Sequence, residues 1–302
     1  MPVYFHGRNA VWQLAKQSDI LIAWGAYDLR AMRQWFRGPV VFVGHGSGNF
    51  DGNAARLATP GASHYVAVAR ASVQPFVDCG IPAERVDVIY NGIDPERCKQ
   101  TVPREETRRK LGIADGEFVV GYLGRMVPEK NPVGIAKAVA LLPPRFRAVF
   151  VGDGYAMKKQ RELIAEVLGK RAVFVDRVED VGNYLAAFDT FALASPAEGF
   201  SMAMLEAMLR DVPCVLTNVG VLPELEEQHG RFWETVKPIH QPQEFADAIL
   251  RVADMTADQR AARIKRARKI VQTKYLAKQM AARWIAYVNK ALATWRPKKC
   301  LA

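Results

Sequence analysis

The chain has 302 residues, half of them hydrophobic, and this length can bury the cores of two compact domains. Its apolar runs reach only about six residues, and 22 Gly and 17 Pro are scattered between them. This pattern excludes a repeat protein and a membrane-spanning helix, which needs about 20 apolar residues. The net charge is +11, and thirteen basic residues against one acidic residue from Thr256 onward account for all of it.

The basic tail has three interpretations. Its cations alternate with Tyr275, Trp284 and Trp295, and such a helix can lie on an anionic membrane surface. The same residues can form a solvated helix face whose aromatic side chains lie in the core. Nucleic-acid binding is the weakest interpretation, because no helix-turn-helix, zinc-finger or RNA-recognition signature accompanies the charge. We expect no nucleic-acid partner.

The four cysteines lie far apart and form no CxxC pair. This is typical of reduced thiols and argues against a disulfide framework or a zinc site. The first residues lack the basic start and long apolar stretch of a signal peptide. We therefore expect a cytoplasmic protein.

Short β-rich runs alternate with helix-period stretches, which predicts parallel sheets in doubly wound α/β domains. In the first part, the predicted strands are residues 19–24, 39–44, 64–69 and 85–90. Residues 91–106 are rich in turn-forming and charged residues and are predicted to connect two domains. In the second part, the predicted strands are residues 118–124, 147–154, 171–176, 190–195 and 213–218. The predicted helices there are residues 133–142, 157–168, 183–188, 201–209 and 244–253.

His45 follows the second predicted strand, in the segment VVFVGHGSGN. Open α/β sheets bind ligands at the carboxyl ends of their strands, so His45 is a candidate site residue. The alternative is a histidine with a structural role.

The segment YLGRMVPEKNP places two cations, Arg125 and Lys130, between a strand that ends at Gly124 and a helix that Pro132 starts. Two cations at the carboxyl edge of a strand can neutralise a diphosphate, and Glu129 can hold one of them in place. A surface charge cluster is the alternative. The segment lacks GxGxxG and a later acidic ribose ligand, which argues against a Rossmann dehydrogenase.

The segment SPAEGFSMAMLEAM carries two glutamates, Glu198 and Glu206, with seven residues between them. Gly199 permits close backbone approach, and the helix that begins just after it would turn its first N–H groups toward an anion. These N–H groups belong to Phe200, Ser201 and Met202. Glu206 can reach an adjacent part of the same ligand. The alternative is a favourable first-turn carboxylate and a solvated one.

Together and in this order, these motifs resemble the donor domain of glycosyltransferase family 4, the retaining enzymes of GT-B fold. The matching segments are GRMVPEKN, VGDG, VFVDRV and SPAEGFSMAMLEAMLRDVPCVLTNVGVLPEL. Upstream, HYVAVARASVQPFVDCGIPAERVDVIYNGID is similar to the last part of that family's N-terminal domain. The resemblance runs from about Ser18 to Ala253. Two departures are Asp211, where the family often has Gly, and TNVGVLPE in place of a double-Gly turn.

The resemblance implies a GT-B fold of two Rossmann-like doubly wound domains that face a cleft. Residues 1–113 would form an acceptor-side domain that is shorter than is usual in the family. Residues 114–280 would form the donor-binding domain, and residues 281–302 a basic helix that can cross back to the first domain.

The resemblance also implies a role for each matching residue. Arg125 and Lys130, beside Gly124, would bind the donor diphosphate, and Glu206 would bind the ribose hydroxyls. Glu198 would contact hydroxyls of the transferred sugar, and His45 would contact that sugar near the reacting centre. The remaining donor contacts would come from the backbone of Gly199, Phe200, Ser201 and Met202 and, at the base, of Arg177 and Val178.

The implied function is transfer of a hexose from a UDP- or GDP-sugar to the hydroxyl of a glycolipid or saccharide acceptor, with retention of configuration. The chain has no DxD triplet, so no metal and no cofactor are expected. A second hypothesis is a nucleotide-sugar-binding subunit without activity of its own, which needs a partner protein for acceptor recognition. The tail would place either protein at the inner face of the plasma membrane.

Overall fold

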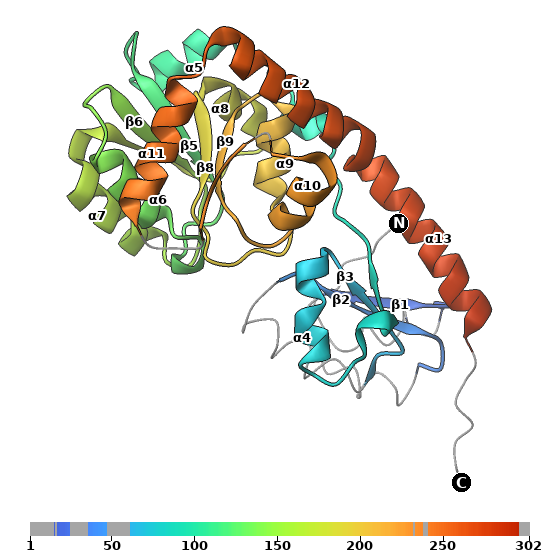
Figure 1. The fold of residues 1–302 in the computed structure, drawn as a ribbon. Coiled ribbons are helices and arrows are strands. Elements are labelled where there is room, and N and C mark those ends of the chain that lie inside the picture. Colours follow the sequence, from blue (N-terminus) through green and yellow to red (C-terminus); the bar gives the residue numbers. More distant parts are fainter. Residues whose placement is uncertain are drawn as a thin grey trace. The chain divides into compact units, whose positions relative to one another are not determined.

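The computed structural model describes residues 15, 17–24, 36–46, 61–231, 233–237 and 241–295. The chain forms two compact units (Figure 1), one of Met1–Asn91 with Lys278–Ala302 and one of Gly92–Ala277. The domain limits expected from the sequence, at residues 113 and 280, stay predictions.

The first unit is built on a parallel sheet with the strand order β1-β2-β3-β4. The strands are β1 (Leu21–Trp24), β2 (Val40–Gly44), β3 (His64–Ala67) and β4 (Val86–Val88). The described helices of this unit are η2 (Arg70–Ser72), α4 (Gln74–Val77), η3 (Ala83–Arg85) and α13 (Ala277–Thr294), which starts at the unit boundary. All residues of β2 are buried, as the continuous apolar run of a central parallel strand requires.

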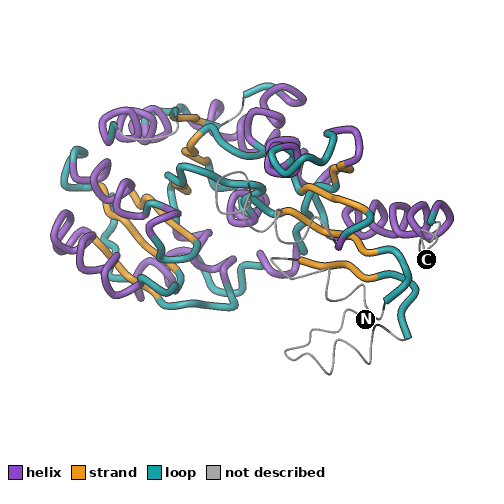
Figure 2. Tube along the Cα trace, turned by 90° about the horizontal axis from the view of Figure 1, so that it is seen from below, coloured by secondary structure: helices purple, strands orange, loops and turns teal. Residues whose placement is uncertain are grey.

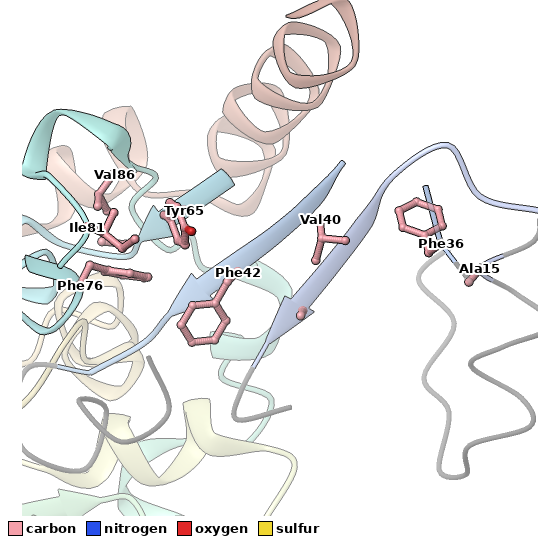
Figure 3. Close-up of a cluster of buried hydrophobic side chains, with 10 residues drawn as sticks. Ala15, Phe36, Val40, Phe42, Tyr65, Phe76, Ile81 and Val86 are labelled. Atoms are coloured by element: carbon pink, nitrogen blue, oxygen red, sulfur yellow. The ribbon is translucent and has the colours of Figure 1, made fainter. Parts of the chain in front are cut away.

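Phe76 of α4 belongs to the cluster of buried hydrophobic side chains that forms the core of this unit (Figure 3). Its ring lies 5.5 Å from that of Phe42 and 5.8 Å from that of Tyr65, edge-on to both. A Cβ at Gly44 would come within 2.8 Å of the Phe76 ring, so the end of β2 must be small there. These aromatic contacts hold α4 against β2 and β3.

The second unit is built on a six-stranded parallel sheet with the order β10-β9-β8-β5-β6-β7. Its strands are β5 (Phe118–Leu123), β6 (Phe146–Val151), β7 (Ala172–Val175), β8 (Thr190–Leu193), β9 (Cys214–Thr217) and β10 (Glu234–Val236). The strand order reverses between β5 and β8. In an open α/β sheet, the carboxyl ends of the strands at such a switch point form the ligand crevice.

Two groups of helices pack on this sheet (Figure 2). In one group, α6 packs on both α7 and α11. In the other group, α8 packs on α5 and on α9, and α9 also packs on α12. The larger helices are α5 (Arg104–Lys110), α6 (Pro132–Ala140), α7 (Met157–Leu168), α8 (Val181–Ala187), α9 (Met202–Leu209), α10 (Leu222–His229), α11 (Pro242–Ala253) and α12 (Ala257–Lys274). Short turns of helix are η4 (Pro95–Cys98), η5 (Pro128–Lys130) and η6 (Gly169–Arg171).

Each strand predicted from the sequence overlaps an observed strand, and each predicted helix overlaps an observed helix. Among the described elements, the short turns of helix, β10, α10 and α5 were not predicted. The boundary between the two units falls at Asn91, where the predicted connection of residues 91–106 begins, and this stretch contains the turn η4 and the start of α5. The sequence of α5, REETRRK, is polar throughout and shows no apolar periodicity that would predict a helix. The strand β10 is only three residues long, which is too short for a recognisable pattern.

The basic tail is tied to the second unit through α12. Four of its arginines donate hydrogen bonds to the body of the unit: Arg260 to the Asp189 carbonyl, Arg263 to Glu234, Arg266 to the His229 carbonyl and Arg268 to Asp211. In the first unit, the Trp284 ring stacks on Trp24 with centroids 6.0 Å apart. Of the aromatic residues of the tail, Tyr275 and Tyr287 are buried, as the interpretation with aromatic side chains in the core expects, whereas Trp284 is only half-buried. Among the described residues, no helix is long and apolar enough to cross a membrane.

Glu234 is the main anchor of this arrangement. Its side chain is 7% exposed, and it accepts from Arg251 of α11 at 2.9 Å and from Arg263 of α12 at 2.7 Å. Burial raises the pKa of Glu234, but the hydrogen bonds from Arg263 and Arg251 outweigh burial and hold the pKa below its ordinary value. One carboxylate on β10 thus joins two helices to the edge of the sheet.

We expect the stabilisation by Glu234 to depend on pH, because its pKa is lower in the folded chain than in the unfolded one. The contribution is complete above the unfolded-state pKa of about 4.3 and is lost as the pH falls through the folded-state pKa. Glu234→Gln should lower the free energy of unfolding at neutral pH by about 1–3 kcal/mol. Urea unfolding should show this difference shrink below about pH 4.

Glu162→Gln is the matched control, because Glu162 is an exposed residue of α7 whose ion pair contributes little. A stability difference for Glu234→Gln that stays constant from neutral to acidic pH would contradict the ion-pair account.

Candidate functional site

The loop that follows β5 is fixed by its neighbours on the sheet. The Gly124 N–H donates to the Val151 carbonyl at 3.0 Å, and the Met126 N–H donates to the Asp153 carbonyl at 2.6 Å. The hydroxyl of the fully buried Tyr122 donates to the Arg125 carbonyl at 2.6 Å. The backbone of Gly124–Met126 is therefore held between β5 and the loop after β6.

Gly152 makes this close approach possible. Its φ is +136°, and a Cβ there would lie 2.0 Å from the Gly124 carbonyl oxygen. A side chain cannot occupy that position. The VGDG segment does not match the GxGxxG motif of dinucleotide-binding proteins. It instead supports the loop that carries Arg125.

Lys130 and Glu198 meet across the switch point. The Lys130 Nζ lies 2.6 Å from Glu198 Oε1, and the side chains are 22% and 11% exposed. Lys130 ends η5, and Glu198 lies between β8 and α9, so the contact joins the carboxyl ends of two neighbouring strands. The structure thus brings together one cation and one carboxylate that the sequence nominated separately.

Arg125 remains exposed beside this pair, and its side chain forms no ion pair with any described residue. Burial raises the pKa of Tyr122 most, and the charge of Glu198 raises it further, whereas the charge of Arg125 lowers it. Glu198 and Arg125 therefore both lie close enough to Tyr122 to interact with it electrostatically. The Glu129 carboxylate accepts a hydrogen bond from the Tyr155 hydroxyl at 2.5 Å, and this bond is the largest cause of its lowered pKa. The charges of Arg125 and Lys130 lower the pKa of Glu129 less, and a role of Glu129 in holding one of the two cations stays a prediction.

The helix α9 begins where the sequence predicts it. Ser201 is its N-cap, with the side-chain oxygen accepting from the Met204 N–H at 3.3 Å, and Met202 is the first helical residue. A capped N-terminus of this kind directs its first N–H groups toward the end of the sheet. Phe200 is buried and its ring lies 5.7 Å from that of Tyr275.

The loop after β9 supports the segment between β8 and α9. The Val221 N–H donates to the Gly199 carbonyl at 3.0 Å. Gly220 has a φ of +63°, and a Cβ there would lie 2.5 Å from the Glu198 carbonyl oxygen. The segment TNVGVLPE, which departs from the family pattern, therefore still has a glycine at the point of closest approach.

Glu206 lies inside α9 and is almost fully buried. The sequence did not reveal its partner, Arg97 of η4, whose Nε donates to Glu206 Oε1 at 2.7 Å. Arg97 follows the NGID motif by three residues. No local pattern relates Arg97 to a residue more than a hundred positions away in the sequence.

Within the second unit, the nominated base contacts lie apart from this cluster. Arg177 and Val178 follow β7, two strands from β5, and no described contact joins them to Lys130 or Glu198. His45 belongs to the first unit, is exposed at the end of β2, and has its ring 5.3 Å from that of Trp24. The roles of all these residues stay predictions.

Asp211, the other departure, follows the last turn of α9. Its φ is +62°, in the left-handed region, which explains why glycine suits this position. Its carboxylate accepts from Arg268, so the side chain is used to hold α12.

We expect Gly220→Ala to displace the Glu198–Gly199 backbone. The new methyl group would clash with two backbone carbonyls, in addition to the cost of about 1–2 kcal/mol for a left-handed alanine. Gly112→Ala is the matched control, because its φ is +67° and no atom lies within 4 Å of the added Cβ. Thermal unfolding should show a clearly larger loss for Gly220→Ala. Equal losses would mean that the loop relaxes freely.

The comparisons with known proteins agree with this geometry. Residues 103–270 match the family Glycosyl transferases group 1, and residues 2–97 match Glycosyltransferase Family 4. The structure of Anabaena HepE in complex with UDP-glucose has a TM-score of 0.82 at 27% identity, over 93% of this chain and 81% of that one.

Two curated relatives each match about half of this chain. The Escherichia coli UDP-Gal:alpha-D-GlcNAc-diphosphoundecaprenol alpha-1,3-galactosyltransferase is 33% identical over 45% of this chain and 37% of the relative. The putative teichuronic acid biosynthesis glycosyltransferase TuaC of Bacillus subtilis is 34% identical over 49% of this chain and 36% of the relative. The chain thus matches little more than a third of the length of these relatives.

The expected fold class is confirmed: two α/β units with parallel sheets, in the GT-B class of the HepE structure. The family model covers more than half of the residues, including both loops and α9. The chain belongs to the Glycosyl transferases group 1 family of glycosyltransferases.

Proposed function

We propose that this protein transfers a hexose from a nucleoside diphosphate sugar to an acceptor hydroxyl, with retention of anomeric configuration and without a metal ion. The observation that carries the proposal is the ion pair of Lys130 with Glu198 at the switch point, beside the capped N-terminus of α9. In this arrangement Lys130 would bind the phosphates and Glu198 would bind hydroxyls of the transferred sugar.

The chemical task is to stabilise negative charge on the departing diphosphate. Lys130, the exposed Arg125 and the first N–H groups of α9 supply positive charge at one edge of the sheet. Fixed donors of this kind need no reorganisation during the reaction, and they would take the place of a metal ion. The nominated site residues include no nucleophile for the opposite face of the sugar. We therefore favour front-face displacement, in which the leaving phosphate helps to deprotonate the acceptor.

The remaining roles follow from the same assignment. Glu206 would bind the ribose, the backbone at Arg177 and Val178 would meet the base, and His45 would lie near the transferred sugar. The name of the Escherichia coli relative contains UDP-Gal, and the Anabaena HepE structure is a complex with UDP-glucose. UDP-hexoses are thus the first donors to test, and a lipid-linked saccharide is the first class of acceptor.

The first test is turnover of UDP-glucose and UDP-galactose, followed as UDP release. Lys130→Ala should lower kcat by about 10²–10³-fold, the usual loss for one donor to a developing negative charge. Lys137→Ala, which removes an exposed cation from the next helix, is the control and should leave turnover unchanged. Wild-type turnover should survive EDTA.

Loss of activity in EDTA and its recovery with Mg²⁺ or Mn²⁺ would contradict the metal-free mechanism. Binding of UDP-sugars without any turnover, in the presence of saccharide acceptors, would favour the second hypothesis of a binding subunit that needs a partner.

We further propose that the tail recruits the protein to an anionic membrane. Because the arginines of α12 are bonded within the second unit, the surface would come from α13. Lys278, Ile285 and Leu292 follow one another at seven-residue intervals on this helix, and Ile285 is 63% exposed. Residues at this spacing share a helix face, as an interfacial helix requires.

Cosedimentation with vesicles tests this surface. Binding should rise with the fraction of anionic lipid and collapse in high salt, because each basic residue at the surface contributes about 1 kcal/mol. Ile285→Asp should weaken binding, and Leu141→Asp, at another exposed apolar residue, should not. Equal partitioning to neutral and anionic vesicles, or none to either, would contradict the proposal.

A further inference from the structure

Arg97 is the direct partner of Glu206, and the roles given so far leave it without a function. Its Nε donates to Glu206 Oε1 at 2.7 Å, and the two side chains are 55% and 6% exposed. Among the described residues, no other group forms a hydrogen bond to the Glu206 carboxylate. One carboxylate oxygen is thus occupied by Arg97, and the second, Oε2, is left for another donor.

The contact compensates for an unfavourable position of the carboxylate. In α9, every residue from Met204 to Leu209 is buried, and Glu206 is the single charged side chain among them. A carboxylate taken out of water loses several kcal/mol of hydration unless a cation and hydrogen bonds replace it. Arg97 provides both, and it also offsets a negative charge that would repel an anionic ligand.

The backbone that carries Arg97 is fixed at both ends. Upstream, the Ile93 N–H donates to the Tyr275 carbonyl, and the Ala277 N–H donates to the Ile93 carbonyl, each at 2.8 Å. Downstream, Asn183 Oδ1 accepts from the N–H groups of Thr101 and Val102 at 2.7 and 2.9 Å. The Arg97 side chain therefore extends from a fixed backbone segment, although the side chain itself is largely exposed.

We propose that Arg97 is a positioning residue that sets the preference for ribose over 2′-deoxyribose in the donor nucleotide. By holding Oε1, it keeps the Glu206 carboxylate in one orientation, so that Oε2 accepts from the vicinal hydroxyls of the ribose. This inference rests on the proposed function, because it takes Glu206 as the ribose ligand. It adds a residue from η4 to a site that α9 alone would otherwise define.

The test is calorimetric titration of UDP and 2′-deoxy-UDP into the full chain. The wild type should bind UDP at least about tenfold more tightly, the usual effect of one hydrogen bond to a charged group. Arg97→Ala should weaken UDP binding by about tenfold and leave 2′-deoxy-UDP binding nearly unchanged, so that the preference disappears. Arg97→Lys should restore part of the preference. Glu206→Gln should also reduce it.

Arg109→Ala is the matched control, because Arg109 is exposed on α5 and makes no described side-chain contact. It should keep the wild-type ratio. Thermal unfolding of each variant identifies any that fail to fold, and Arg97→Gln, which keeps a long polar side chain, replaces Arg97→Ala in that case.

The outcomes separate the two proposals. An unchanged ratio in folded Arg97→Ala or Arg97→Gln would overturn the role of Arg97 and leave donor binding intact. Equal affinity of the wild type for UDP and 2′-deoxy-UDP would overturn the role of Arg97 together with that of Glu206. No binding of either UDP or 2′-deoxy-UDP by the wild type would instead refute UDP as the donor nucleotide.

Discussion

The ion pair of Lys130 with Glu198 is the contact on which the candidate site depends. It joins the loop after β5 to the loop after β8, at the one place where the strand order of the second sheet reverses. Both side chains are mostly shielded from water, so the loss of either partner would leave the other with an uncompensated, partly buried charge. A diphosphate sugar offers new partners to both groups at once.

Backbone packing holds these two loops in place. Gly152 permits the close approach to Gly124, and Gly220 permits the close approach to Glu198, in each case because a Cβ would overlap a backbone carbonyl. The buried hydroxyl of Tyr122 then fixes the Arg125 carbonyl. The site is thus preorganised by rigid contacts between strand ends, and the polar side chains that would meet ligand need little further ordering.

The fold class and the candidate residues in the loops after β5 and β8 could be predicted from the sequence, because both depend on local patterns. Continuous apolar runs such as that of β2 predict buried parallel strands, and the order of the Arg/Lys loop and the two glutamates indicates the family. The Arg97–Glu206 contact has no such signal, because its residues meet only after the chain has folded. The polar helix α5 was also missed, since its position depends on Arg104 and Arg108 bonding to Asp189.

The most direct test is a crystal structure of the protein with UDP bound. The account predicts the diphosphate within hydrogen-bond distance of Lys130 and Arg125, the ribose on Glu206, and Lys130 shared between Glu198 and the phosphates. A nucleotide bound elsewhere, with the contact between Lys130 and Glu198 unchanged, would contradict it.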